Sequence, residues 1–97
     1  MTPDEAIAAL EGFRAPAEVA ELPSTPERPV EVDRRPDRPQ SRLDLDRGNG
    51  MTVTVGRVRR CNLLDLRLVL LSHNTMRGAA GAALQNAELL VRRGLVQ

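Results

Sequence analysis

The positions of the prolines are the strongest constraint on what this chain can fold into. Every proline except Pro3 lies between Pro16 and Pro39, in a stretch with almost no apolar periodicity. Because proline fixes φ and lacks a backbone N–H, it ends helices and is excluded from the centre of a sheet. We therefore expect residues 14–50 to be mainly connection, either an arm draped over a larger body or a disordered segment, with one short edge strand at Val30-Glu31-Val32.

Regular patterns flank this arm on both sides. Thr2-Pro3-Asp4-Glu5 predicts the start of a short helix, with Thr2 as N-cap and Glu5 completing a capping box. After the arm, Gly48-Asn49-Gly50 predicts a turn, and residues 51–55 alternate as a half-buried strand does. The apolar register changes at Gly56, which indicates a bulge or the close approach of another backbone.

The remaining elements are a second strand and a helix. Residues 66–71 are apolar except for Arg67, and such a strand is typical of a position covered on both faces. Residues 76–93 have an amphipathic stripe that Gly94 ends. The chain has one Phe and no Trp or Tyr, so it has few large side chains with which to build a core. These elements cannot cover the second strand, and we expect partner structure from elsewhere.

Composition excludes several classes of function. The formal net charge is +1 with both signs interspersed, and the lack of aromatic stacking residues argues against RNA or another nucleic acid as partner. No segment approaches the roughly 18 apolar residues of a membrane span, and the N-terminus does not resemble a signal peptide. The single cysteine excludes an internal disulfide. We expect a cytoplasmic protein with no membrane partner.

Residue types that often carry catalysis occur without the partners that the chemistry requires. His73 would suit a general base, but no nucleophile accompanies it, so we interpret it as a hydrogen-bonded histidine at a strand end. Cys61 has no helix N-terminus close behind it, and its arginine neighbours favour the thiolate only modestly, so we interpret it as structural.

The charged residues point to neither a phosphate site nor a metal site. Arg57, Arg59 and Arg60 fit a solvated or salt-bridged strand face better than a phosphate patch. Asp44, Asp46 and Asp65 lack metal-ligand spacing relative to one another or to His73. We predict no catalytic residue and no metal.

The segment 72–81 is the best candidate for a binding site. A strand ends there in polar residues, and a helix opens with little side-chain bulk. Such an opening exposes free backbone N–H groups and lets a ligand approach the backbone closely. The alternative is that the small residues only let this helix pack tightly on a neighbouring element.

Two stretches carry a resemblance to a known family. They read DRPQSRLDLDRGNGMTVTVGR at 37–57 and LSHNTMRGAAGAALQNAEL at 71–89. Together they are similar to the C-terminal end of aspartate-semialdehyde dehydrogenase of the type found in archaea, fungi and some bacteria. Residues 2–29 also resemble the helix and proline-rich link that precede these motifs. Ser41 departs from the proline common in the family, a change that we expect only to adjust the loop.

The resemblance implies an α+β fragment: strands plus a C-terminal helix from a two-domain α/β dehydrogenase, which has a Rossmann cofactor domain and an α+β dimerisation domain. Residues 1–71 would form the C-terminal part of the catalytic and dimerisation domain, including the arm 14–50. Residues 72–97 would form a C-terminal helix that packs on the NADP-binding domain, which is missing here. The partners implied are the remainder of the enzyme or a full-length subunit, in a homo-oligomer.

The family carries out the NADPH-dependent reductive dephosphorylation of aspartyl phosphate to aspartate semialdehyde, on the route to lysine, threonine and methionine. Its phosphate loop, nucleophilic cysteine, catalytic histidine and substrate arginine lie upstream of the matching residues, which implies that this chain is inactive alone and binds NADP only within the parent enzyme. Asn74 is similar to the asparagine that approaches the nicotinamide end of NADP, with Thr75 and Gly78 as further contacts. The alternative is a standalone, non-catalytic interaction module that pairs with a full-length subunit.

Overall fold

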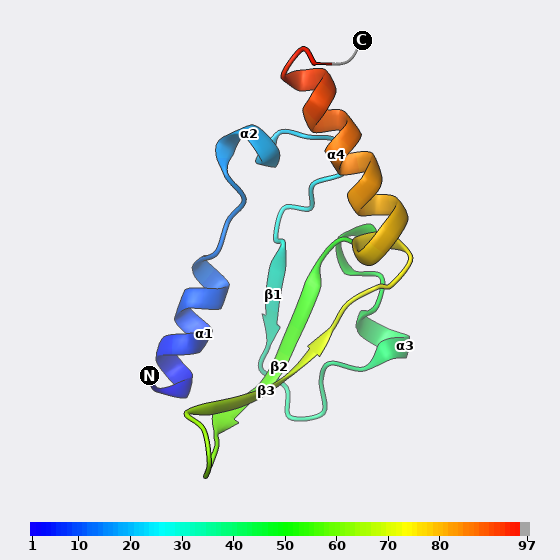
Figure 1. The fold of residues 1–97 in the computed structure, drawn as a ribbon. Coiled ribbons are helices and arrows are strands. Elements are labelled where there is room, and N and C mark those ends of the chain that lie inside the picture. The colour runs from blue at the N-terminus through cyan, green and yellow to red at the C-terminus, as the bar shows by residue number, and fades with distance from the viewer. Residues whose placement is uncertain (96–97) are drawn as a thin grey trace.

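The computed structural model describes residues 1–95, so the last two residues of the predicted segment 72–97 lie outside the described residues. The helical elements are α1 (Pro3–Gly12), α2 (Ala17–Ala20), α3 (Ser41–Asp44), a 3-10 turn (Arg47–Gly50), a π-turn (Met76–Ala80) and α4 (Gly81–Arg92). The strands are β1 (Val30–Asp33), β2 (Val53–Arg60) and β3 (Leu66–Leu71). They form one sheet in the order β1-β2-β3, with β1 parallel and β3 antiparallel to β2 (Figure 1). The predicted α+β class is confirmed.

Helix α1 begins as its sequence predicts. The Thr2 hydroxyl accepts a hydrogen bond from the Glu5 N–H at 3.2 Å, and the Glu5 carboxylate accepts one from the Thr2 N–H at 3.2 Å. These bonds satisfy two backbone donors that a helix start otherwise leaves free. Ala6 is buried, and α1 packs on β1 and β2. The helix therefore covers one face of that half of the sheet.

The arm 14–50 is ordered and holds more structure than predicted. The edge strand at Val30–Val32 is confirmed as part of β1, which pairs with β2 from Val30 to Asp33. Helices α2 and α3 were not predicted, because a helix of four residues is too short to show a 3.6-residue apolar period. The structure thus favours order over the alternative of disorder.

Strand β2 is the central strand, and the prediction of a half-buried strand is wrong. Thr54 and Val55 are 0% and 1% exposed, although they point to opposite faces. Parallel pairing sets Thr54 beside Glu31, on the face that residues 38–50 cover. The alternating sequence predicts that Thr54 faces solvent, but the loop 38–50 covers it. The local sequence pattern does not indicate where this loop lies.

Gly56 shows both features that the change of register predicts. The pairing of β2 with β3 shifts between Gly56 and Arg59, which is a β-bulge, and Arg57 within it has a φ of 53°. A Cβ built on Gly56 would overlap the carbonyl oxygen of Arg38 and lie 2.6 Å from Cδ of Pro39. The loop before α3 therefore crosses directly over the centre of the sheet.

Strand β3 has the predicted bounds, but it lies at the edge of the sheet. Leu68 and Leu70 are 38% and 62% exposed. The apolar sequence of this strand is typical of one covered on both faces. The described residues leave it uncovered, as the sequence analysis expects. Among residues 1–95, no helix combines the length and hydropathy needed to cross a membrane.

The helix after β3 begins less regularly than the range 76–93 predicts. Gly78 N donates to the His73 carbonyl at 3.1 Å and Ala80 N donates to the Thr75 carbonyl at 2.8 Å, which is the wider spacing of a π-turn. A Cβ on Gly81, where α4 starts, would overlap the Met51 sulfur. This glycine therefore serves close packing, while Gly94, with a φ of 73°, follows the helix as predicted.

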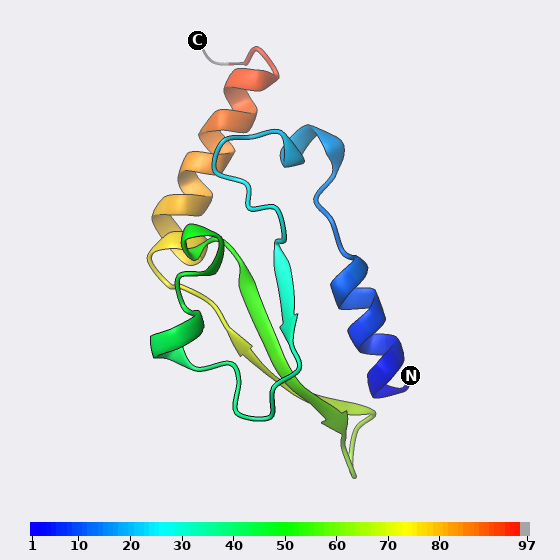
Figure 2. The same cartoon turned by 180° about the vertical axis from the view of Figure 1, so that it is seen from behind.

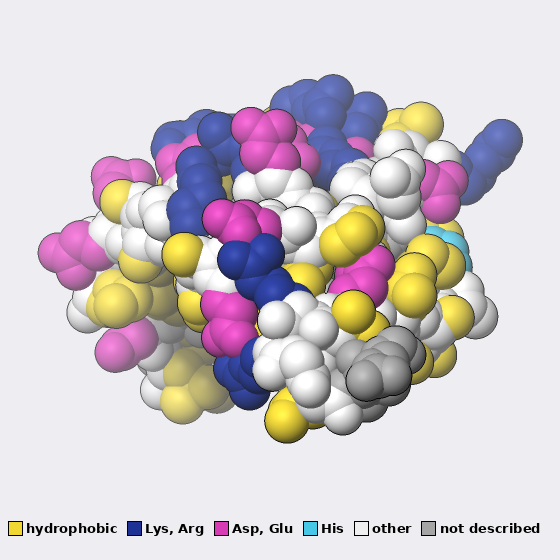
Figure 3. All heavy atoms as spheres, turned by 90° about the horizontal axis from the view of Figure 1, so that it is seen from above, with side chains coloured by type: hydrophobic (Ala, Val, Ile, Leu, Met, Phe, Trp, Pro, Cys, Tyr) yellow, Lys and Arg dark blue, Asp and Glu magenta, His cyan; other side chains and the backbone are white. Residues whose placement is uncertain are grey.

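The first part of the arm runs beside α4 (Figure 2), and polar contacts join the two. Ser24 donates from its N–H and its hydroxyl to the Glu88 carboxylate at 3.1 and 2.5 Å, and the Gln85 amide donates to the Thr25 hydroxyl at 2.6 Å. Two ion pairs, Glu21 with Arg92 and Glu18 with Arg93, continue this seam. Charged and hydrophobic side chains are interspersed on the surface seen from above (Figure 3).

Substitution Gly56→Ala should lower the free energy of unfolding by about 1–3 kcal/mol, because the added methyl group forces the Arg38 carbonyl away from the sheet. Urea unfolding of the purified chain measures this change. Gly12→Ala is the matched control, since no atom lies within 4 Å of a Cβ built there. Equal stabilities of the two variants would contradict the close approach at Gly56.

Candidate functional site

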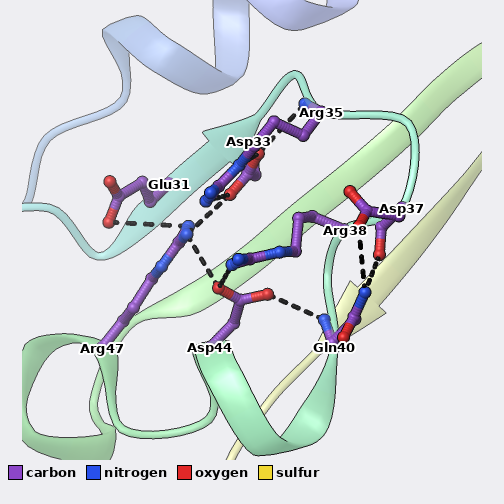
Figure 4. Close-up of polar contacts among 8 residues, drawn as sticks. All are labelled: Glu31, Asp33, Arg35, Asp37, Arg38, Gln40, Asp44 and Arg47. Atoms are coloured by element: carbon purple, nitrogen blue, oxygen red, sulfur yellow. Dashed lines mark hydrogen bonds and ion pairs between the residues drawn. The ribbon is translucent and has the colours of Figure 1, made fainter.

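A buried ion cluster fastens the loop 34–50 to the end of β1 (Figure 4). The Asp44 side chain is 1% exposed, and its Oδ1 accepts hydrogen bonds from Arg38 at 2.7 Å and Arg47 at 2.9 Å. Its Oδ2 accepts one from the Gln40 N–H at 2.7 Å. Arg47 also donates to Asp33 Oδ2 at 2.6 Å. Arg47 therefore bridges two buried carboxylates, one on β1 and one on α3.

The cluster keeps both carboxylates ionised. Hydrogen bonds from the Arg35 side chain hold the pKa of Asp33 well below its usual range, although burial opposes them, and Arg47 contributes further. Burial alone would raise the pKa of Asp44, but the hydrogen bond from the Gln40 N–H and the charges of Arg47 and Arg38 lower it. Asp44 is thus occupied by cations of the protein. Within residues 1–95, no three His, Cys, Asp or Glu side chains gather as a metal site would require.

The loop held by this cluster forms one wall of an open pocket at the end of β3. The pocket has a volume of about 380 Å³. Its lining consists of two residues from the loop, the last residue of β3 and the four residues that follow it, namely Ser41, Leu45, Leu71, Ser72, His73, Asn74 and Thr75. The structure thus brings Asn74 and Thr75 together at one pocket. Sequence reasoning missed the loop residues, because only the fold brings them beside the SHNT stretch.

Gly78 lies outside this lining, in the π-turn that follows. It is exposed, and a Cβ built on it would meet only the His73 carbonyl oxygen, at 3.8 Å. The backbone is therefore open to a neighbouring group at Gly78, in contrast to Gly81, where Met51 fills the space. The sequence left two interpretations of the small residues in this segment, close packing of the helix or access for a ligand. Gly81 fits close packing, and Gly78 fits access to the backbone.

His73 holds the turn that presents Asn74. Its Nδ1 accepts hydrogen bonds from the Thr75 N–H at 3.3 Å and the Met76 N–H at 3.2 Å, and it lies 3.0 Å from the Thr75 hydroxyl. The imidazole thereby satisfies backbone donors at the start of a helical segment. This is the hydrogen-bonded role predicted for His73.

Asn74 is left with its amide available. The residue is exposed at the pocket, and its side chain makes no hydrogen bond within residues 1–95. A side-chain amide offers donors and an acceptor in one plane. This combination suits a planar group with the same two functions, such as a carboxamide.

The structure does not bring the other reactive side chains to this pocket. Cys61 lies between β2 and β3, at the opposite end of β3 from His73. Hydrogen bonds from the backbone of Leu64 and Leu63 lower the pKa of its thiol. Arg59 donates to the Arg57 carbonyl at 2.7 Å and stands directly opposite Arg67 in the sheet.

Substitution Asp44→Asn should destabilise the chain by about 2 kcal/mol, because it removes the charge from buried hydrogen bonds and leaves Arg38 and Arg47 less well compensated. Chemical denaturation measures the loss. Asp46→Asn makes the same replacement of a carboxylate by an amide at a nearby exposed residue, and it should have little effect on stability. A loss as large at Asp46 would show that the buried cluster is not the cause.

Lowering the pH should weaken the same cluster. The folded-state pKa values of Asp33 and Asp44 lie below the roughly 3.9 of an unfolded aspartate. Their contribution to stability is therefore complete above that value and is lost as the pH falls through it toward the folded-state pKa. Urea titrations from about pH 6 to pH 2 should show the loss mainly below about pH 4, and a smaller loss in Asp44→Asn. An identical pH profile for the variant would contradict this assignment.

Comparison with known proteins identifies the family of this chain. The family model for the semialdehyde dehydrogenase dimerisation domain matches residues 1–77. The aspartate-semialdehyde dehydrogenase of Archaeoglobus fulgidus is 46% identical over 96% of this chain and 26% of its own length. The malonyl CoA reductase (NADP) of Metallosphaera sedula is 43% identical over 90% of this chain and 25% of its own length.

A solved structure agrees with the sequence comparisons. The crystal structure of aspartate semialdehyde dehydrogenase with NADP from Candida albicans matches with a TM-score of 0.85 and 40% identity, over 99% of this chain and 27% of that chain. The chain thus spans about a quarter of the length of the relatives it matches. The match of the family model over most of the chain, together with these identities, shows that the chain belongs to the semialdehyde dehydrogenase family and carries sequence of its dimerisation domain.

Proposed function

We propose that the chain is the C-terminal portion of an NADP-dependent aspartate-semialdehyde dehydrogenase. The whole enzyme would catalyse the reductive dephosphorylation of aspartyl phosphate to aspartate semialdehyde. The observation that carries this proposal is the pocket after β3, where the SHNT stretch presents the free amide of Asn74. The similarity to enzymes of that name, at 46% identity in Archaeoglobus fulgidus, supports it.

Asn74 is the residue that we assign to the cofactor. Its amide donates to and accepts from the carboxamide of the nicotinamide ring, and NADPH supplies the hydride when it is bound. Thr75 helps to fix the turn through His73 and offers its hydroxyl at the same pocket. Gly78 provides clearance for the cofactor, because its backbone is open. That the Candida albicans enzyme was solved with NADP supports this cofactor.

Helix α4 is proposed to pack on the cofactor domain, so that residues 72–97 belong to that side and residues 1–71 to the dimerisation side. Apolar side chains of α4 stay exposed beside the arm. Leu84 and Val91 are each 55% exposed there, and with Ala87, Leu22 and Pro23 they line an apolar groove of about 410 Å³. A second apolar surface on this groove would remove these side chains from water.

The chain is proposed to be inactive alone and to act within a homo-oligomer of the whole enzyme. Among the described residues, Cys61 and His73 lie at opposite ends of β3, so they do not form a nucleophile and base pair. The description of the matching family domain as a dimerisation domain supports assembly with other subunits.

A second candidate differs only in the acyl substrate. The Metallosphaera sedula malonyl CoA reductase is 43% identical to this chain, a value close to the 46% of the Archaeoglobus fulgidus enzyme. This segment therefore fits a reductase of either acyl group. Because its assigned role is contact with NADP, the test below follows the cofactor.

A chimera tests the cofactor assignment directly. The part of the Candida albicans enzyme that matches this chain is replaced by residues 1–97, and NADPH formation from aspartate semialdehyde and phosphate is followed. The chimera should be active, and Asn74→Ala should raise the KM for NADP about tenfold, because it loses hydrogen bonds to the carboxamide. The KM for the semialdehyde should change little. Asn62→Ala, an exposed asparagine between β2 and β3, should behave as the parent chimera.

Each result separates the proposals. Unchanged kinetics of Asn74→Ala would contradict the contact with the nicotinamide. A folded chimera without activity would contradict the assignment of the parent enzyme. If the isolated chain instead co-purifies with an intact, already active enzyme and leaves its rate unchanged, it is an interaction module.

A further inference from the structure

The outer edge of β3 is an unpaired strand edge. β3 pairs with β2 on one side only, and no further strand follows it in the sheet of residues 1–95. Half of the backbone N–H and C=O groups of such a strand point away from the sheet and are available to another strand. Natural edge strands are usually blunted by charge, proline or a bulge. Over Leu66–Leu71, β3 carries only Arg67 as such a feature.

One face of the same strand is apolar and uncovered. Leu70 pairs with Val55, and by alternation Leu66 and Leu68 share its face. Val55 lies on the face that α1 covers, yet Leu70 remains 62% exposed because α1 packs over β1 and β2. The sheet therefore has a covered half and an uncovered half on one continuous apolar face.

The other face of β3 carries a pair of like charges. Arg67 stands directly opposite Arg59, and like charges in this position destabilise a strand pair. Within residues 1–95, neither guanidinium forms an ion pair with a carboxylate. A neighbouring strand that brings a carboxylate would relieve this repulsion.

We propose that the edge of β3 is completed by a β-strand from the remaining three quarters of the dehydrogenase, whose apolar side chains continue the face of Leu66, Leu68 and Leu70. This inference rests on the proposed function. Its further basis is that relatives matching the chain are about four times as long, so they contain ample additional chain. The new strand joins β3 by main-chain hydrogen bonds. Its apolar side chains extend the apolar face of β3, which is uncovered in the described residues.

Hydrogen exchange tests the proposal on the isolated chain and on the active chimera described above. The β3 amides that point away from β2 should exchange at least about tenfold more slowly in the chimera than in the isolated chain, because the new strand accepts their hydrogen bonds. The amides of residues 54–56 in β2 serve as an internal control, since β2 is paired there with both β1 and β3 in the chain itself. Equal exchange of β3 in both proteins overturns the proposal. Protection in the isolated chain that rises with its concentration also overturns it, because a second copy is then the occupant.

A pair of lysine variants provides an independent measurement. Leu70 and Leu43 are 62% and 58% exposed, so Leu70→Lys and Leu43→Lys should be tolerated equally in the isolated chain. In the chimera, only Leu70→Lys should lower the melting temperature, by several degrees. Equal melting temperatures of the two chimeras overturn the proposal.

Activity separates this inference from the proposed function. An active chimera with unprotected β3 refutes only the added strand. An inactive chimera with protected β3 refutes only the proposed function.

Discussion

The contact on which most of the fold depends is the sharing of Arg47 by two buried carboxylates. Asp33 ends β1 and Asp44 ends α3, so this one guanidinium joins the sheet to a loop that has little regular structure of its own. Burying charge is costly unless every partner is present, and the net gain in stability over an apolar cluster is small. The benefit is one of geometry. With the loop fixed over Gly56, Thr54 is buried and the wall of the pocket at Asn74 is set.

Helix α4 and strand β3 share an unusual distribution of polarity. Helix α4 bonds to the arm through Gln85 and Glu88, and the apolar side chains next to them on the helix stay exposed. Strand β3 likewise exposes leucines on the face that α1 covers elsewhere. In a self-sufficient domain these surfaces would form the core, because apolar burial is the main favourable term in folding. Their exposure is the physical counterpart of a chain that spans a quarter of its relatives' length.

Local chemistry made part of this structure predictable. The capping box at Thr2, the bounds of β3 and the change of register at Gly56 depend on residues close in sequence, and each is confirmed. The burial of Thr54, the π-turn after Thr75 and the pairing of Arg47 with Asp33 depend on contacts between distant residues, and no local pattern indicates them. Asn74 was identified by resemblance, whereas the loop that faces it was found only in the fold.

In the proposed enzyme, the position of Asn74 accounts for NADP binding by the whole protein and not by this chain alone. The residue sits on a turn between β3 and α4, and His73 fixes that turn by bonding to backbone N–H groups on the α4 side. If β3 is completed by another strand and α4 packs on a cofactor domain, the amide of Asn74 is positioned by both attachments at once. A hydrogen bond to a carboxamide contributes only about 1 kcal/mol, far less than the free energy needed to hold a dinucleotide. In the proposed enzyme, the turn therefore orients the nicotinamide ring only after other structure has bound the rest of the cofactor.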